Sequence, residues 1–461
     1  MNRERKLIGT RAFYAMVLAV TVPIVVQNSI TCFVSLLDNI MVGRVGTEQM
    51  SGVAIANQLI MVFELSIFGG ISGAGIFAAQ FFGHGDLEGV RNAFRIKLFT
   101  GLLVAAAAIV IFLLLGERLI RQFLMGAADV GDVDATAAFG LRYLRIIMIS
   151  FIPFALTQVY SSTLKETGET VLPMTASIIA VLLNLVLNYL LIFGKLGLPA
   201  MGGSGAAVAT VISRFVELGV VSLGTHRRAE RYQFARGLYR TLRVPAALLW
   251  NVVRKGVPLL ANELLWSSGM AILNQCYSLR GLSVVAGINI SSTIVNLFSV
   301  VMMAMGNAVA IIVGQQLGAG DMEKARDTDR KLIAFAVGVS VAVGALLALA
   351  APFIPRIYNT EDAVRLLATQ FMMVSGCVMP INAFSLTSYF TLRSGGKTII
   401  TFLFDSAYTW VLTIPLAYCL AHFTALPIVP VYLIVQLSGL VKCAVGFILV
   451  KKGVWLNNIV T

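Results

Sequence analysis

Charged residues are scarce in this sequence. Only 12% of its 461 residues are Asp, Glu, Lys or Arg, whereas soluble domains contain about 25%. Hydrophobic residues make up 58% of the chain, and apolar runs long enough to cross a bilayer, about 18 residues or more, recur along its length. These two features exclude a soluble globular fold and predict an all-α polytopic membrane protein.

Histidine and cysteine are also rare, with 3 and 5 copies. The cysteines stand far apart inside apolar runs, without a Cys-x-x-Cys or Cys/His pairing, which argues against a disulfide framework or a zinc site. The histidines form no catalytic constellation, and the chain has no Walker phosphate-binding sequence. We therefore expect no enzymatic activity, no cofactor and no direct use of ATP.

We predict about twelve membrane-spanning helices, from the length that a bilayer requires. Because this number is even, both ends of the chain should lie on one side. The segment Met1–Arg11 leads into a full-length span and lacks the cleavage site of a secretory signal peptide. The approximate limits are 13–39, 52–80, 96–115, 138–162, 172–194, 205–224, 257–279, 285–315, 332–352, 368–391, 399–421 and 428–450.

Basic residues give the chain a net charge of +13, and most of them stand on the N-terminal side of the predicted spans. The positive-inside rule makes that side cytoplasmic. We interpret this charge as cytoplasmic loop charge and expect no nucleic-acid partner. The basic residues on this side are Arg3, Arg5, Lys6, Arg11, Arg91, Arg95, Lys97, Lys324, Arg326, Arg330, Lys331, Arg393, Lys397, Lys451, Lys452 and those of the connection His226–Arg243.

The chain contains an internal repeat. The segment around Pro258 matches the segment around Pro23, and 258 − 23 = 235. Gln80–Arg91 matches Gln315–Arg326 at the same offset, 315 − 80 = 235, and both copies contain the pattern Gly-x-Gly-Asp-x-Glu. Matches in the same order along the chain indicate a duplicated unit.

A third match, between Leu164–Thr170 and Leu392–Thr398 at an offset of 392 − 164 = 228, completes the pattern. We predict two similar six-helix bundles related by a pseudo-twofold axis along the membrane normal, because each half has an even number of spans. The predicted domains are an N-terminal lobe (1–224), a basic cytoplasmic linker (225–252) and a C-terminal lobe (253–461).

Two such bundles leave a cleft between them, which is the architecture of an alternating-access secondary transporter. Prolines stand in matching spans of both halves, Pro23 with Pro258 and Pro153 with Pro380. A proline inside a helix removes a backbone hydrogen bond and clashes with the preceding turn. These positions are therefore either flexing points or fixed kinks that packing requires.

Asp38 stands near the end of the first predicted span. An ionised Asp at the centre of a membrane helix costs about 2.5–3.5 kcal/mol, so an Asp retained there usually faces a wet cavity and handles an ion or a proton. The alternative is that Asp38 lies in the headgroup zone as a polar residue at a helix end.

Three further polar residues complete a candidate cation site. Asn184 and Asn188 share one helix face because they are four residues apart, and Thr210 lies in the next span. With Asp38 they offer only oxygen ligands, which suit a hard cation such as Na⁺ or a hydrogen-bond network around a protonated Asp. Alternatively, the two asparagines only hold helices together by hydrogen bonds of about 0.6 kcal/mol each.

The sequence resembles the multidrug and toxic compound extrusion (MATE) transporters, bacterial members of the MOP flippase superfamily. The resemblance covers essentially the whole chain, and the paired Gly-x-Gly-Asp-x-Glu turns contribute to it. Its other motifs are Leu36–Gly46, Val53–Gln58, Asn184–Gly194, Gly203–Arg214 and Trp410–Tyr418.

This resemblance implies a V-shaped, monomeric antiporter of the bacterial inner membrane. It implies export of amphipathic, often cationic compounds in exchange for Na⁺ or H⁺, with these compounds and membrane lipids as partners. The family's N-lobe cation site resembles the set Asp38, Asn184, Asn188 and Thr210. Many members have an acidic residue where this chain has Asn188, so Asp38 is left as the only formal charge of the set.

Glu263 is a second candidate, five residues after Pro258 and the repeat counterpart of Asn28. Some family members couple cations through a carboxylate in this span, but the tenth span here has no acidic partner for it. We interpret Glu263 as a secondary cation or substrate contact, or else as a structural polar contact.

Arg214 and Glu217, three residues apart, are predicted to pair. Asp405 is predicted to cap a helix start or to act in function.

Two other functions compete with drug export. The first is a flippase for lipid-linked precursors from the same superfamily, which would need a cationic cavity. The second is a membrane scaffold that transports nothing, although the chain has no large soluble domain for binding. A scaffold would show no ligand-stimulated cation flux.

Overall fold

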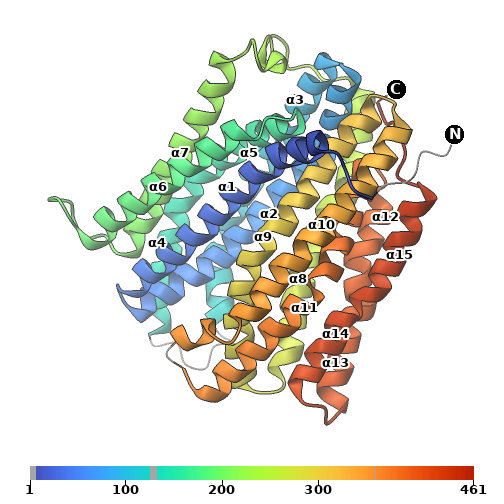
Figure 1. Ribbon diagram of the computed structural model, residues 1–461. Helices are drawn as coiled ribbons and strands as arrows, with labels where there is room; N and C mark the ends of the chain where they lie inside the picture. The colour runs from blue at the N-terminus through green and yellow to red at the C-terminus, as the bar shows by residue number, and fades with distance from the viewer. Residues whose placement is uncertain (1–6, 125–131, 359, 461) are drawn as a thin grey trace. The chain divides into compact units, whose positions relative to one another are not determined.

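The structure, a computed structural model, describes residues 7–124, 132–358 and 360–460. Within these ranges every regular element is a helix (Figure 1). The basic residues Arg3, Arg5 and Lys6 lie outside the described residues. The first half forms α1 (Arg11–Gly43), α2 (Thr47–His84), α3 (Leu87–Leu124), α4 (Val133–Ile147), η1 (Met148–Ser150), α5 (Phe151–Glu166), α6 (Val171–Phe193) and α7 (Gly203–Arg227).

The second half follows the same plan. A short helix, η2 (Gln233–Ala235), lies in the connection between the halves. The helices are α8 (Ala246–Ser278), α9 (Leu282–Gly318), α10 (Met322–Ala350), η3 (Ile354–Ile357), α11 (Asp362–Ser394), α12 (Thr398–Phe402), η4 (Leu403–Ala407), η5 (Thr409–Thr413), α13 (Ile414–Phe423), α14 (Ile428–Leu437) and α15 (Gly439–Lys452).

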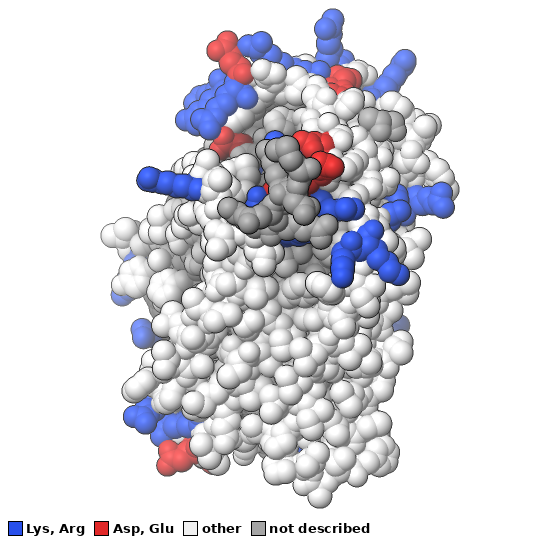
Figure 2. Space-filling view, turned by 45° about the vertical axis from the view of Figure 1, so that its right-hand side comes forward, with Lys and Arg blue, Asp and Glu red and all other residues white. Residues whose placement is uncertain are grey.

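The predicted fold class, an all-α polytopic membrane protein, is confirmed. In the described part of the chain, 11 helical segments are long and apolar enough to cross a membrane. The predicted span 257–279 coincides with most of α8, which is a long helix but is not among those 11. Figure 2 shows charged side chains toward the two ends of the visible face and an almost uncharged band between them, as a bilayer-spanning surface requires.

Three predicted spans are not continuous α-helices. In the fourth, the chain tightens to a 3₁₀ turn at Met148–Ser150 just before Pro153, whose ring cannot donate a backbone hydrogen bond and crowds the preceding turn. In the eleventh, two π-helical segments, η4 and η5, precede α13. The twelfth is divided into α14 and α15 at Ser438. Sequence periodicity alone does not reveal such local changes of helix type.

Contacts group the chain into two compact units. The N-unit contains Val26–Ala78 and Asp86–Gly256, and the C-unit contains Met1–Val25, Ala79–Gly85 and Val257–Thr461. The units therefore differ from a simple division at the linker, because short segments of each half join the other half's unit.

In α1 and α8, the chain passes from one unit to the other close to the two repeat-related prolines. In α1 the chain changes unit two residues after Pro23, and in α8 two residues before Pro258. The start of α1 joins the C-unit because Val17 and Ile24 are buried in its core. The start of α8 joins the N-unit because a side chain at Gly73 would collide with the backbone of Gly256.

A close helix crossing inside the C-unit displays the internal repeat directly. A Cβ atom on Gly83 would collide with the backbone carbonyl of Gln315, and one on Gly318 would collide with that of Gln80. These four residues are the two copies of one Gln-x-x-Gly sequence. Only glycine permits such an approach of two helix backbones, so both copies need it.

The C-terminal segment closes this crossing. Trp455 is fully buried, and the carbonyl of Asn457 accepts a hydrogen bond of 3.2 Å from Gln80 Nε2. Gln80 Nε2 also donates to the carbonyl of Ser394 at 2.9 Å, while Gln80 Oε1 accepts from the amide of Ile459 at 2.8 Å. One glutamine therefore joins the end of α2, the end of α11 and the tail.

The connection between the halves packs back onto the N-unit. Arg91 Nε and Arg95 Nε donate to the carbonyls of Phe234 and Leu238, each at 3.2 Å. Phe234 is buried. Part of the predicted basic linker is thus a folded element, because its backbone carbonyls accept hydrogen bonds from arginines of α3.

Candidate functional site

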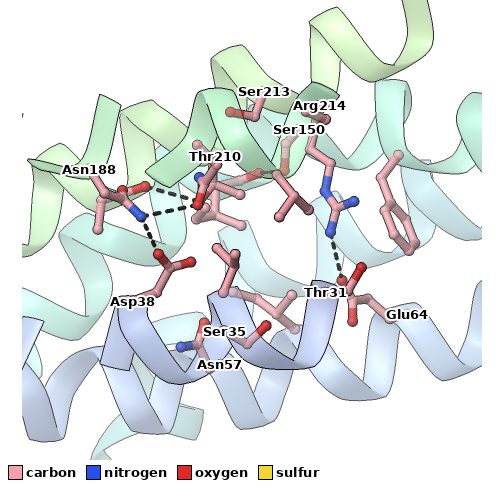
Figure 3. A pocket seen from close by; sticks show the side chains of 18 of the residues that line it. Thr31, Ser35, Asp38, Asn57, Glu64, Ser150, Asn188, Thr210, Ser213 and Arg214 are labelled. Atoms are coloured by element: carbon pink, nitrogen blue, oxygen red, sulfur yellow. Dashed lines mark hydrogen bonds and ion pairs between the residues drawn. The ribbon is translucent and has the colours of Figure 1, made fainter. Parts of the chain in front are cut away.

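The N-unit contains a cavity of about 290 Å³. Six helices line it, namely α1, α2, α4, α5, α6 and α7, together with η1. Asp38 and Asn188 lie at one end of the cavity, and Arg214 and Glu64 lie at the other (Figure 3). The cavity is therefore a polar site inside a membrane-spanning bundle, which is where functional charges are expected.

Helical periodicity explains why polar side chains meet here. On α1, the residues Thr31, Ser35 and Asp38 follow the spacing i, i+4, i+7 and line the cavity together. On α2, Asn57 and Glu64 are seven residues apart and share a face in the same way. These spacings place the polar side chains of each helix that line the cavity on one face.

The structure brings the four predicted cation-site residues together. Asn188 Nδ2 donates to Asp38 Oδ1 at 2.6 Å and to Asn184 Oδ1 at 3.0 Å, and Asn184 Nδ2 donates to Thr210 Oγ1 at 3.2 Å. If the oxygen and nitrogen of the Asn184 amide are exchanged, its nitrogen lies 3.0 Å from Asp38 Oδ2 and its oxygen accepts from Thr210. In both orientations Asp38 is in contact with the asparagines.

One oxygen of this set has no donor. Asn188 is 1% exposed, and its Oδ1 atom is buried without a hydrogen-bond partner among the described residues. A buried acceptor without a partner costs about 1–3 kcal/mol. An added cation or proton beside Asp38 would supply the missing positive partner, so the donor set fits a small cation.

The other end of the cavity holds an ion cluster. Arg214 Nη1 lies 2.9 Å from Glu217 Oε2, as the spacing predicts, and Arg214 Nη2 lies 3.7 Å from Glu64 Oε1. The guanidinium also lies over the ring of Phe154, 4.9 Å from its centroid. Sequence reasoning did not select Glu64, although its spacing from Asn57 places both residues on the cavity face of α2.

Glu263 lies in the C-unit, where Tyr389 Oη donates to Glu263 Oε1 at 3.4 Å. It does not belong to the Asp38 set. Next to it, Asn262 donates to Asp405 Oδ2 at 3.2 Å, and Asp405 forms an ion pair with Lys442. Asp405 lies within the π-helical segment η4 and makes no cap, so the capping prediction is wrong and the lysine explains why this acid is tolerated.

Comparison with known proteins identifies the family. The family model MatE matches residues 23–190 and again residues 258–419. The chain belongs to the MatE family. The two matches begin 258 − 23 = 235 residues apart, the offset of the internal repeat. The predicted MATE resemblance is therefore confirmed, and the family's members are membrane transporters.

Curated relatives match most of the chain. A probable multidrug resistance protein NorM of Thermotoga maritima is 25% identical over 87% of this chain and 84% of its own length. The multidrug resistance protein PmpM of Pseudomonas aeruginosa is 27% identical over 89% of this chain and 84% of its own length.

Solved structures have the same fold. One, an outward-facing conformation of a multidrug resistance MATE family transporter of the MOP superfamily, has a TM-score of 0.86 at 21% identity and covers 97% of this chain and 96% of that one. A MOP superfamily transporter from Pyrococcus furiosus, described as having a binding pocket of reversed polarity, has a TM-score of 0.84 at 20% identity and covers 98% of both chains.

Proposed function

We propose that this protein is a secondary active antiporter that exports amphipathic, often cationic compounds in exchange for Na⁺ or H⁺ by alternating access. Family membership and the names of relatives such as NorM and PmpM support multidrug efflux. The observation that carries the coupling proposal is Asp38, held by Asn188 at 2.6 Å in the wall of an intramembrane cavity.

Asp38 couples the two fluxes through its charge. An ionised Asp inside the membrane costs about 2.5–3.5 kcal/mol unless a positive partner neutralises it. A bound Na⁺ or proton provides that partner on the outer side, and its loss on the inner side restores the charge. The state of the carboxylate therefore changes the relative free energies of the conformations that the transport cycle requires.

Both coupling ions fit this set of ligands. Na⁺ would take oxygens from Asp38, Asn184, Asn188 and Thr210, and the partnerless Asn188 Oδ1 favours such a ligand role. A proton on Asp38 would instead donate to a neighbouring amide oxygen. Glu263 would be a secondary cation or substrate contact in the C-unit.

The proposed setting is a bacterial inner membrane, with both termini in the cytoplasm. The basic connections on the N-terminal side support this orientation through the positive-inside rule. We propose that the protein works as a monomer with small amphipathic molecules and lipids as its partners, without nucleic acid.

The flippase alternative is less well supported by the cavity. Phosphate groups of a lipid-linked precursor would need a cationic site. The charged residues that line the cavity are three acids, Asp38, Glu64 and Glu217, and one base, Arg214, for a net charge of 1 − 3 = −2. A negative cavity favours cationic substrates instead.

The test is ethidium transport by the purified protein in proteoliposomes, with a Na⁺ gradient and a pH gradient imposed separately. We expect one gradient to drive ethidium against its concentration difference, and the other to have little effect. If neither gradient drives ethidium or a fluoroquinolone, while a fluorescent lipid is moved between leaflets, the flippase alternative replaces this proposal.

A further inference from the structure

The cavity holds a second acid whose role differs from that of Asp38. We propose that Glu64 binds the positive charge of the transported compound, so that Asp38 is left free for the coupling ion. This inference rests on the proposed export function and names the residue that would bind the cationic group of the substrates proposed there.

Pairing distances show which acid is in surplus. Arg214 has two acidic neighbours, and the closer one, Glu217, lies at 2.9 Å with a side chain that is only 6% exposed. Glu64 lies at 3.7 Å and is 43% exposed. Glu217 is the closer and more buried partner of Arg214, which is itself 29% exposed, so the looser and more open Glu64 can bind a second cation.

Aromatic side chains surround this end of the cavity. The rings of Phe63 and Phe151 stack with centroids 3.9 Å apart, and Phe154 lies 5.8 Å from Phe63. All three line the cavity. Ring faces attract cations and planar ring systems. A carboxylate beside aromatic walls is therefore suited to a cation that carries aromatic groups.

The two acids are far enough apart to bind separate charges. Thr210, in contact with Asn184 beside Asp38, is one helical turn before Arg214, which corresponds to about 6 Å along α7. Figure 3 shows the two groups at opposite ends of the cavity. The cavity thus has a separate carboxylate for each charge, Asp38 for the coupling ion and Glu64 for the substrate cation, and exchange can fill them in turn.

A matched pair of ligands tests this assignment. Methyltriphenylphosphonium and triphenylphosphine oxide have nearly the same shape, but only the first is charged. Their affinities for the purified protein in detergent are compared between wild type and Glu64→Gln. We expect the phosphonium to bind about tenfold more weakly, or worse, in the variant, since a desolvated charge partner is lost. The affinity for the neutral oxide should change less than about twofold.

Two further variants keep the test interpretable. Glu48→Gln removes an exposed acid from the start of the same helix, outside the cavity lining, and should leave both affinities unchanged. Glu64→Asp keeps the charge and should restore phosphonium binding to within a fewfold of wild type. If Glu64→Gln does not fold, Glu64→Ala replaces it, with the same expected loss of phosphonium binding. Equal phosphonium affinity in wild type and Glu64→Gln, or equal weakening of both ligands, overturns the proposal.

Gradient-driven uptake separates this inference from the export function. If wild type binds the phosphonium through Glu64 but no ion gradient moves it, the export function fails and the Glu64 assignment stands. If gradients drive the phosphonium equally well in wild type and Glu64→Gln, the export function stands and the Glu64 assignment fails.

Discussion

The two halves of this duplicated protein place a basic residue at the same position of their last span, but surround it differently. Arg214 and Lys442 are related by 442 − 214 = 228, the offset of the third repeat match. Lys442 forms an ion pair with one acid, Asp405, whereas Arg214 has two, Glu217 and Glu64. The C-unit pair is therefore balanced, and the N-unit cluster has one acid in excess.

A second difference points the same way. The repeat counterpart of Asp38 is Leu273, since 38 + 235 = 273, and Leu273 packs in an apolar core of the C-unit. The side chains of Lys442 and Asp405 are 17% and 16% exposed, compared with 43% for Glu64. The two halves thus share the same helices, but the acidic residues in excess over basic ones lie in the cavity of the N-unit.

The largest expected effect comes from unbalancing the C-unit pair. Lys442→Met leaves Asp405 buried without its cation, and we expect a loss of about 3–5 kcal/mol in the free energy of unfolding. The measurement is denaturant unfolding in detergent. The double variant with Asp405→Leu should regain most of this loss. An unchanged free energy of unfolding in the single variant would show that Asp405 does not need Lys442 as a partner.

Asp38→Asn should remove coupling without unfolding the protein, because the amide keeps the size of the carboxylate. We expect gradient-driven ethidium transport to fall by roughly 100-fold, the equivalent of the 2.5–3.5 kcal/mol that an intramembrane charge represents. Flux assays in proteoliposomes measure this, with Glu48→Gln as the control. Transport at the wild-type rate would remove Asp38 from the mechanism.

Asn188→Leu sharpens the choice of coupling ion. The change removes the partnerless Asn188 Oδ1 and the hydrogen bond to Asp38, at 2.6 Å in the native protein. If Na⁺ binds here, the Na⁺ concentration for half-maximal transport should rise about tenfold, since a ligand to a charged group is lost. If the driving ion is H⁺, the loss of the donor to the carboxylate should instead shift the pH profile of transport toward higher pH.

The smallest effect is expected in the C-unit. Glu263→Gln keeps the side-chain oxygen that accepts from Tyr389 and should change ethidium transport by only about twofold to threefold. Initial transport rates compared with those of Asp38→Asn provide the measurement. A loss as large as that of Asp38→Asn would instead give the two units equal roles in transport.

The sequence alone predicted the features that follow from residue periodicity or from the high free-energy cost of a charge inside a membrane. Span positions follow from apolar length, and the repeat follows from Pro23, Pro258 and the Gln-x-x-Gly copies. Asn184 and Asn188 could be placed together because four residues make one helical turn. Asp38 was conspicuous because an intramembrane acid is rare.

Other features depend on packing between distant segments, which the sequence does not display. The π-helical segments near Asp405 have no periodic signal of their own. The start of α1 joins the C-unit through the burial of Val17 and Ile24, which is a tertiary effect. Glu64 needed the three-dimensional knowledge that its helix face and that of Arg214 meet at one cavity.

The buried tail around Trp455 has a practical consequence for handling this protein. Because Gln80 binds the tail backbone at both Asn457 and Ile459, a purification tag that began three residues after Ile459 would lie close to an anchored amide. A bulky fusion there would compete with the packing of Trp455 and open the ends of α2 and α11. Removing residues 455–460 would have the same result, so affinity tags and fluorescent reporters should be kept away from this segment.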